Sequence, residues 1–381
     1  MHRGIATFTL DTGRCPRWLF ERMVKLGREM TRVIVEEFGP EEFIRRLADP
    51  VWFQSLGTVL AFDWNASGLT TTLTAALKEA IRGQERSLGV FICGGKGATS
   101  RKTPDQIKAW AEVLALPDGY ADNFIYNSRL SAKVDSALIQ DGYQIYHHTF
   151  FFTLSGAWTV VQQGMNQANK TARRYHWHSA DITDLIQEPH TGIASQIQAL
   201  NPLNLTASES GQAREISLEL VRAGYRTLMS DIKLLRKYSS RLSQMVSFKA
   251  GDNQLTLLNL SRSEFHSHPV ESQNFWRSRY LEKIFAQVCE HQPASYEDLL
   301  SLKGVGPKTV RALALVAEVI YGAEVSYQDP ARFSFAHGGK DGTPYFVNRQ
   351  RYDKVIEIMR KIVGKMKIDY SEKRRILAQL K

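Results

Sequence analysis

Hydrophobic positions in the first hundred residues combine helical spacing with two short apolar runs. Residues 17–48 carry apolar side chains at the three-and-four spacing of a helix that packs on one side. The run GTVLAFDW at residues 57–64 is short and apolar, which predicts a buried strand. A loop, NASG, then a helix ending near Gly83 and the run SLGVFICGGKG follow it. This order predicts a βαβ unit with two parallel strands joined by a right-handed crossover.

Residues 122–180 form the densest polar and aromatic stretch of the chain. A helix is expected over residues 131–140, ending at Asp141-Gly142. The next segments, YQIYHHTFFFTL and AWTVVQQGM, alternate with period two on either side of a turn at Ser155-Gly156. This pattern predicts an antiparallel hairpin, and a third strand is expected over residues 173–177.

A change of pattern divides the chain into two parts. Residues 195–212 are polar, nearly uncharged and contain a proline, which is typical of a domain boundary. We therefore expect an α/β or α+β domain with a β-hairpin region over residues 1–195 and a linker over residues 196–212. An all-α domain is expected over residues 213–381. A chain of 381 residues is long enough for two domains.

The composition is that of a folded protein with excess positive charge. Hydrophobic residues make up 43% of the chain and charged residues 23%, which is ordinary for a protein with a buried core. Lys and Arg outnumber Asp and Glu by 49 to 39, which favours a polyanionic partner, nucleic acid first. No apolar stretch reaches the ~18 residues that cross a bilayer, and the three cysteines have neither disulfide nor metal spacing. We expect a cytoplasmic, nucleoid-associated protein.

Most of the excess of positive over negative charge lies near the C-terminus. Residues 340–381 hold 12 Lys or Arg and five Asp or Glu. Apolar residues recur at helical spacing along RYDKVIEIMRKIVGKM, so one side of this helix is expected to pack. The other side can contact phosphates, or it can be a solvated surface. The DNA-binding candidates here are Lys340, Arg360 and Lys361.

The second apolar run leads into a glycine-rich segment, GGKGATSRKTP. Its glycines allow close approach to the backbone, its Lys and Arg supply charge, and Thr103-Pro104 fits a helix start that favours phosphate. The segment lacks the Walker spacing of nucleotide triphosphatases. A flexible turn with solvated cations is the alternative. The phosphate-binding candidates are Gly94, Gly95, Lys96, Gly97, Arg101 and Lys102.

Acidic residues beside the predicted hairpin suggest metal chemistry. Carboxylates hold Mg²⁺ or Mn²⁺, a neighbouring side chain orients or deprotonates water, and arginines bind phosphate, so metal-dependent phosphodiester cleavage is the first expectation. The metal-ligand candidates are Asp135, Asp141 and Asp63. The catalytic candidates are Asp135, Asp141, His148, Gln163, Arg173, Arg174 and His176. A structural histidine pair, and an arginine-aromatic surface that contacts nucleic acid without chemistry, are the alternatives.

Residues 299–321 carry the most specific motif in the chain. Their sequence, with LLSLKGVGPKTVRALAL, resembles the helix-hairpin-helix DNA-binding motif. Its two glycines turn the backbone and leave amide groups at a helix N-terminus, where a phosphate oxygen binds without any base being read. The DNA-binding candidates in it are Gly304, Val305, Gly306, Lys308 and Thr309. Use of the motif for protein packing alone is the alternative.

The same motif resembles that of base-excision DNA glycosylases of the helix-hairpin-helix superfamily. In that family a lysine at the position of Lys308 forms a Schiff base, and an aspartate follows it; here Asp329 follows after 21 residues. The resemblance implies attack of the amine on a sugar carbon. The next segment, ARFSFAHGGKDGTPYF, departs from the glycosylase pattern. A glycosylase or lyase is therefore the alternative to a nuclease, and a non-enzymatic binding module is the second alternative.

Seven segments spread along the chain resemble the domain of unknown function 763, a family of archaea and bacteria. They are ATFTLDTGRCPRWLFERMVKL, FDWNASGLTT, GGKGATSRKTP, SAKVDSALIQDGYQIYHH, VVQQGMN, ARRYHW and FAHGGKDG. The resemblance covers nearly the whole length and implies a connection with DNA without assigning a reaction. We expect duplex or structured DNA as the partner, with RNA as an alternative because phosphate contacts do not distinguish the sugars, and no membrane.

Overall fold

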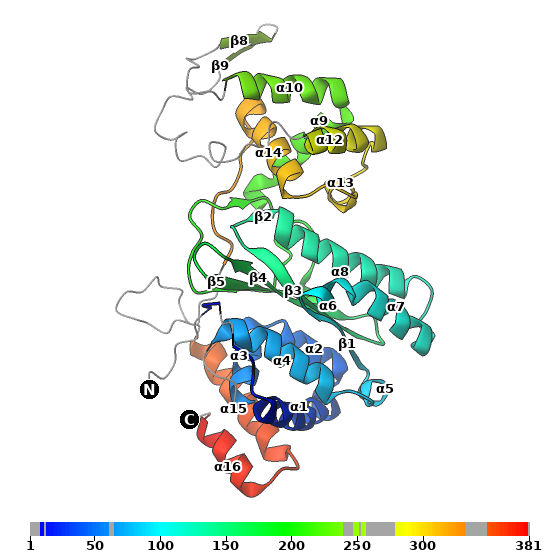
Figure 1. The fold of residues 1–381 in the computed structure, drawn as a ribbon, viewed down its shortest axis with the longest axis vertical. Coiled ribbons are helices and arrows are strands. Elements are labelled where there is room, and N and C mark those ends of the chain that lie inside the picture. The colour runs from blue at the N-terminus through cyan, green and yellow to red at the C-terminus, as the bar shows by residue number, and fades with distance from the viewer. Residues whose placement is uncertain are drawn as a thin grey trace, which may run out of the picture.

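The computed structural model describes residues 8–10, 13–60, 65–238, 247–250, 253–256, 279–331 and 349–379. A five-stranded antiparallel sheet lies between a helical layer on one side and a larger helical region on the other (Figure 1). Two residues expected in functional sites, Asp63 and Lys340, lie outside the described residues. Among the described helices, none combines the length and apolar character that a membrane span requires.

The first helical layer contains α1 (Arg17–Phe38), α2 (Pro40–Leu47), α3 (Pro50–Val59) and α4 (Ala66–Ala80). The helical prediction for residues 17–48 is confirmed. The strand expected to begin at residue 57 is wrong, because that part of the apolar run is the last turn of α3. The side chain of Asp49 caps α3 by accepting the Val51 amide at 2.9 Å, and Pro50 fits the first helical position. These two residues start the helix before the apolar run, and the helix includes residues 57–59 of the run.

The central sheet has the strand order β1-β3-β4-β5-β6. The predicted hairpin is confirmed as β3 (Gln144–Thr153) and β4 (Trp158–Asn166), and the third predicted strand is β5 (Thr171–His178), followed by β6 (Gly192–Ser195). The second apolar run forms β1 (Val90–Lys96). The expected parallel βαβ unit is wrong, because β1 pairs antiparallel with β3 and a helix stands in place of its first strand.

Period-two alternation gives the sheet two apolar faces. Ile92, Phe151 and Val161 pack on the first helical layer. Phe150 and Trp177 belong to the core on the other face. Each strand is therefore buried on both sides, and polar residues within it point into one core or the other.

The second face is covered by α7 (Thr103–Leu114) and α8 (Tyr120–Ala137), with the short helices α5 (Glu85–Leu88) and α6 (Ala98–Arg101) beside β1. Beyond them lies a helical region, as expected. Its helices are α9 (Gly211–Arg222), α10 (Tyr225–Tyr238), α12 (Arg279–His291), α13 (Tyr296–Ser301) and α14 (Pro307–Tyr321). Two further antiparallel pairs are short. One consists of β2 (Ile139–Gln140) and β7 (Leu203–Asn204), and the other of β8 (Ser247–Ala250) and β9 (Asn253–Thr256).

The basic tail forms α15 (Arg349–Lys365) and α16 (Tyr370–Gln379). Its predicted packing side is confirmed, since Met359 and Val363 are fully buried, but their core is that of α1 to α4. Lys365 also forms an ion pair with Glu37 of α1. The tail thus lies at the opposite end of the molecule from α13 and α14 (Figure 1), although its sequence position groups it with them.

Candidate functional site

A short turn at residues 302–306 joins α13 to α14. Ser295 caps α13 by accepting the Asp298 amide at 3.0 Å. Gly304 has φ +91°, and an added Cβ would lie 2.3 Å from Cδ1 of Ile284 in α12. Val305 is buried beneath the turn. The positive φ favours glycine at residue 304, and a larger residue there would also displace the end of the Ile284 side chain.

The N-terminus of α14 has no side-chain cap. Gly306 is the N-cap residue, Pro307 has no N–H, and the Val310 amide donates to the Gly306 carbonyl at 3.0 Å. The Lys308 side chain is exposed, whereas Thr309 is buried. The side chains of Val305 and Thr309 therefore support the hairpin from inside, and the surface that we call the hairpin surface, residues 303–308, presents Lys303, Gly306 and Lys308.

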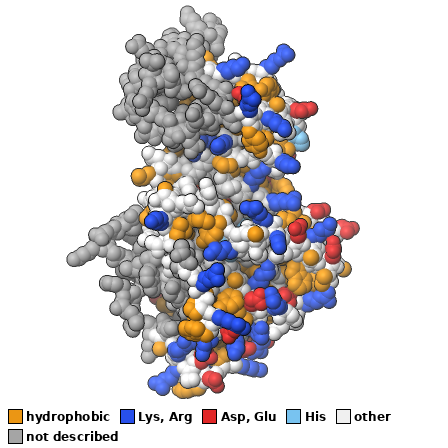
Figure 2. All heavy atoms as spheres, viewed as in Figure 1, with side chains coloured by type: hydrophobic (Ala, Val, Ile, Leu, Met, Phe, Trp, Pro, Cys, Tyr) orange, Lys and Arg blue, Asp and Glu red, His pale blue; other side chains and the backbone are white. Residues whose placement is uncertain are grey.

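Two further elements hold this surface in place. The Lys133 ammonium on α8 donates to the Leu302 carbonyl at 2.6 Å, and burial lowers the pKa of Lys133 to about 8. The Gln140 amide of β2 donates to the Pro307 carbonyl at 2.9 Å. On the other side, Lys283 and Lys303 line a cavity of about 580 Å³ between α12 and the turn. Lys and Arg side chains are visible over this upper helical region in Figure 2.

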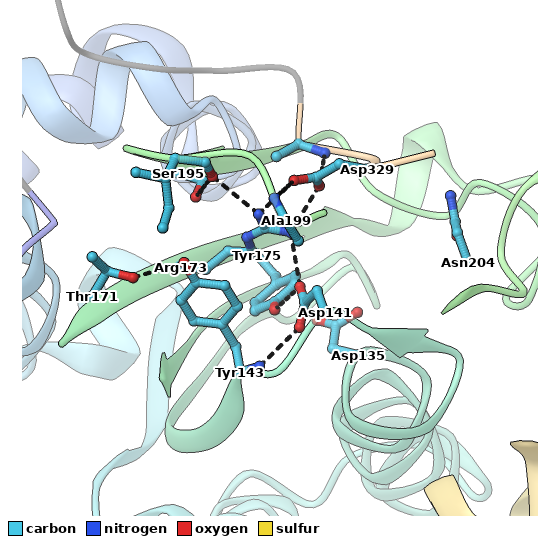
Figure 3. A network of polar contacts seen from close by, with 12 residues as sticks. Asp135, Asp141, Tyr143, Thr171, Arg173, Tyr175, Ser195, Ala199, Asn204 and Asp329 are labelled. Atoms are coloured by element: carbon cyan, nitrogen blue, oxygen red, sulfur yellow. Dashed lines mark hydrogen bonds and ion pairs between the residues drawn. The ribbon is translucent and has the colours of Figure 1, made fainter. Parts of the chain in front are cut away.

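Arg173 of β5 lies in a buried network with two carboxylates (Figure 3). Its guanidinium donates to Asp141 at 2.8 Å and to both oxygens of Asp329 at 2.8 and 2.7 Å. The Tyr175 hydroxyl donates to Asp141 at 2.8 Å, and the ring centre of Tyr143 lies 4.7 Å from the guanidinium carbon. Burial opposes the charge on Arg173, but the carboxylates outweigh it and raise the pKa of Arg173 above its ordinary value. Arg173 therefore binds carboxylates of its own chain.

Asp329 has no oxygen left for a role beside Lys308. Its Oδ1 accepts the Ala331 amide at 2.9 Å and its Oδ2 accepts the Ala199 amide at 2.5 Å, in addition to the two bonds from Arg173. Lys308, by contrast, is exposed on α14. In this structure Asp329 anchors the segment after the hairpin to the central sheet.

Asp135 of α8 is the end of a second buried network. It accepts hydrogen bonds from Gln162 and His190. The Gln162 carbonyl oxygen accepts from Nδ1 of His148 at 2.8 Å, so Nε2 of the neutral ring accepts from the Ser128 hydroxyl at 2.9 Å. Burial lowers the pKa of His148, which agrees with a neutral ring. The sequence indicated Asp135 and His148 but not their partners.

Arg174 follows Arg173 along β5 but points to the opposite face of the sheet. Its guanidinium carbon lies 4.5 Å from the ring centre of Phe53, and its Nε donates to Nε2 of His176 at 2.8 Å. Nδ1 of His176 donates to the Leu47 carbonyl at 3.0 Å, and burial together with Arg174 lowers the pKa of His176 well below its usual value. Gln163 is opposite Arg174 in the strand register and shares this face.

The structure thus divides the seven expected catalytic residues between two faces of one sheet. Asp135, Asp141, His148 and Arg173 lie on the α8 face, and Gln163, Arg174 and His176 lie on the α4 face. All seven are buried. The expected joint phosphate clamp of the two arginines is wrong, because consecutive strand residues point to opposite faces. Within the described ranges, no group of three His, Cys, Asp or Glu side chains forms a metal-binding cluster.

The glycine-rich segment is split by the structure. Gly94, Gly95 and Lys96 line a cavity of about 910 Å³ between α1 and α4, whereas Gly97, Arg101 and Lys102 are exposed outside its wall. Two further cations, Arg28 and Lys78, line this cavity and were not predicted from the sequence. Lys78 follows Thr71 and Thr74 at helical spacing, so the polar stripe of α4 was the signal that could have revealed it.

Comparison with known proteins places the chain in a family. The family model described as "Protein of unknown function (DUF763)" matches residues 4–347. The chain belongs to this family. No curated protein and no solved structure matches it. The resemblance inferred from the seven sequence segments is therefore confirmed.

The DUF763 match includes the whole central sheet, helices α13 and α14 and the turn between them. It ends at residue 347, and α15 begins at Arg349. The two basic features of the chain thus differ, because the hairpin surface belongs to the matched residues, whereas helices α15 and α16 of the basic tail do not.

Proposed function

We propose that this DUF763 protein binds the backbone of duplex DNA through its hairpin surface. The supporting observation is the uncapped N-terminus of α14 between the exposed side chains of Lys303 and Lys308. Amide groups at a helix N-terminus bind phosphate oxygens, and adjacent lysines add attraction to the polyanion. The hydrogen bonds from Lys133 of α8 and Gln140 of β2 support the backbone on either side of this surface.

The proposed recognition reads phosphates and no bases. Backbone contacts of this kind give salt-dependent affinity that is largely independent of sequence, with a Kd of about 10⁻⁴ to 10⁻⁶ M for non-specific binding at physiological salt. The net charge of +10 supports association with any polyanion, and the hairpin fixes where on the protein that association occurs.

The proposal covers binding and includes no reaction. The nuclease expectation relied on Asp135 and Asp141, whose oxygens accept hydrogen bonds from buried protein groups. The lyase expectation relied on Asp329, which Arg173 and two amides occupy. The basic tail has no part in the proposed DNA contact. It packs on the first helical layer, and its core is separate from that of α13 and α14.

The test is fluorescence anisotropy with a labelled duplex of about two helical turns, titrated at several salt concentrations. Lys308→Met should weaken binding and reduce the slope of log Kd against log salt by about 1, because one phosphate contact is lost. Gly306→Val should also weaken binding, since a Cβ at residue 306 meets open space and covers the amide without strain. Gly304 is avoided because its replacement would clash with Ile284.

The matched control is Lys108→Met, which removes the same charge from an exposed position on α7. It should leave both Kd and the salt slope close to those of the unmodified protein. Equal affinities of Lys308→Met, Gly306→Val and the unmodified protein for the duplex would contradict the proposal that the hairpin surface binds DNA.

A further inference from the structure

A second candidate binding site lies on the other side of the sheet from α13 and α14. The cavity of about 910 Å³ is formed by α1, α4 and the end of β1. Five cationic side chains line it: Lys25, Arg28, Lys78, Arg82 and Lys96. Two carboxylates, Glu21 and Glu79, lie in the same wall, so the lining has a net positive charge. Its volume lies within the range of small-molecule sites, ~300 to 1,000 Å³.

Lys78 is the best-positioned of these cations. Its ammonium donates to the Gly94 carbonyl at 3.0 Å and to Oε1 of Gln106 at 2.7 Å. Both acceptors are neutral, and an ammonium has a third N–H to offer. Lys78 is half-buried, and this burial lowers its pKa. An anion in the cavity would meet a half-buried positive charge that these two bonds do not neutralise.

The protein holds this lysine in place before any ligand binds. Gln106 of α7 accepts at the same oxygen from the Gly94 amide at 2.9 Å, so it joins the lysine to the end of β1. Gly94 has φ +89°, and an added Cβ would lie 2.3 Å from the His148 carbonyl oxygen. The glycine is therefore required for the close approach of β1 and β3 that forms this wall.

We propose that this cavity binds a small phosphorylated molecule, with its phosphate at Lys78 and Arg28. A dianionic phosphate accepts from more donors than a carboxylate, and the wall offers cations from three elements as well as the side chains of Thr71 and Thr149. The cavity is larger than a phosphate, so it has room for the group that the phosphate carries. This site does not depend on the hairpin surface, and either proposal can fail without the other.

The experiment is isothermal titration of the full chain with four probes at constant ionic strength: inorganic phosphate, glycerol 3-phosphate, ribose 5-phosphate and AMP. At least one phosphate ester should bind saturably with one site per chain. Ala75 is exposed on α4 and lines the cavity, so Ala75→Glu adds a negative charge there. It should raise the Kd about tenfold or more, whereas the neutral Ala75→Gln should retain binding.

A second pair of variants removes a charge without adding one. Lys25→Met alters an exposed lysine of the wall, and it should raise the Kd about tenfold, while Lys108→Met on α7 should not. Melting temperatures of the unliganded variants confirm that each one folds.

Absence of saturable binding by all four probes, or equal binding by Ala75→Glu and Ala75→Gln, would overturn the proposal. Tighter binding of a 5′-phosphorylated oligonucleotide than of AMP, if Ala75→Glu abolishes it and Ala75→Gln does not, would overturn the small-molecule part of the proposal.

Discussion

Arg173 and Asp329 form a two-pronged ion pair between the central sheet and the chain that follows the hairpin. Both guanidinium Nη atoms donate to the carboxylate, at 2.8 and 2.7 Å, and the Asp329 side chain is 4% exposed. The same guanidinium binds Asp141, so one buried cation joins two carboxylates from distant parts of the sequence. This arrangement connects the helical region to the sheet, and it gives each of the three residues a structural role.

Removal of Asp329 is expected to destabilise the protein strongly. Asp329→Ala leaves part of the buried Arg173 charge without its partner, which should lower the free energy of unfolding by about 3 to 5 kcal/mol. Urea denaturation measures this change. Asp118→Ala, at an exposed position, should stay within about 0.5 kcal/mol of the unmodified protein.

The double variant separates a structural role from a catalytic one. Arg173→Met combined with Asp329→Ala should cost less than the sum of the two single changes, because the buried cation leaves together with its partner. If the losses in the free energy of unfolding of the two single variants add up in the double variant, Arg173 and Asp329 do not stabilise each other. A loss of activity without loss of stability in Asp329→Ala would speak for the glycosylase-type role instead.

Acid is expected to destabilise the protein through its buried histidines. Burial lowers the pKa of His147 to about 3, and its Nδ1 has no partner among the residues that the structure describes. Below pH 6.5 the unfolded chain binds a proton that the folded chain does not, so stability is complete above this pH and falls toward pH 3. From pH 7.5 to pH 5, His147 alone should cost about 2 kcal/mol.

The check compares urea denaturation of the unmodified protein with that of His147→Gln at both pH values. The variant keeps the other buried histidines, so the stability gap between the two proteins should change by about 2 kcal/mol in favour of the variant at pH 5. Parallel pH profiles would show that His147 is not responsible.

DNA binding is expected to need no divalent cation. The hairpin surface offers amide groups and lysines, and the oxygens of Asp135 and Asp141 accept hydrogen bonds inside the protein. Addition of EDTA should therefore leave the Kd for duplex DNA unchanged in the anisotropy assay. A manganese-dependent cleavage that disappears in a folded Asp141→Asn variant would contradict the structural role of Asp141.

The strands and helices with strong local patterns were predictable from the sequence. Strands β3 and β4 alternate regularly around Ser155-Gly156, and the tail repeats apolar residues at helical spacing. The helical state of residues 57–59 was not predictable, because a short apolar segment fits a buried helix as well as a strand. The direction in which β1 pairs could not be predicted from its local sequence either. Its partner strand, β3, follows α7 and α8 in the chain.

The candidate site shows the same limit at the level of side chains. Period-two alternation already separates Arg173 from Arg174, so their split between two faces was open to prediction. The partners of the buried carboxylates were not, because His190 lies 55 residues from Asp135 and Asp329 lies 156 residues from Arg173. Only the tertiary fold shows that these charged groups bind one another.

The most direct test compares the hairpin surface with the basic tail by matched charge reversal. Lys303→Glu/Lys308→Glu and Arg360→Glu/Lys361→Glu change the net charge equally, and all four side chains are exposed. Anisotropy titration with the same duplex should show a large rise in Kd for the hairpin variant and a small, salt-screened change for the tail variant. Equal losses in both variants, or a loss confined to the tail variant, would contradict the assignment of DNA binding to the hairpin.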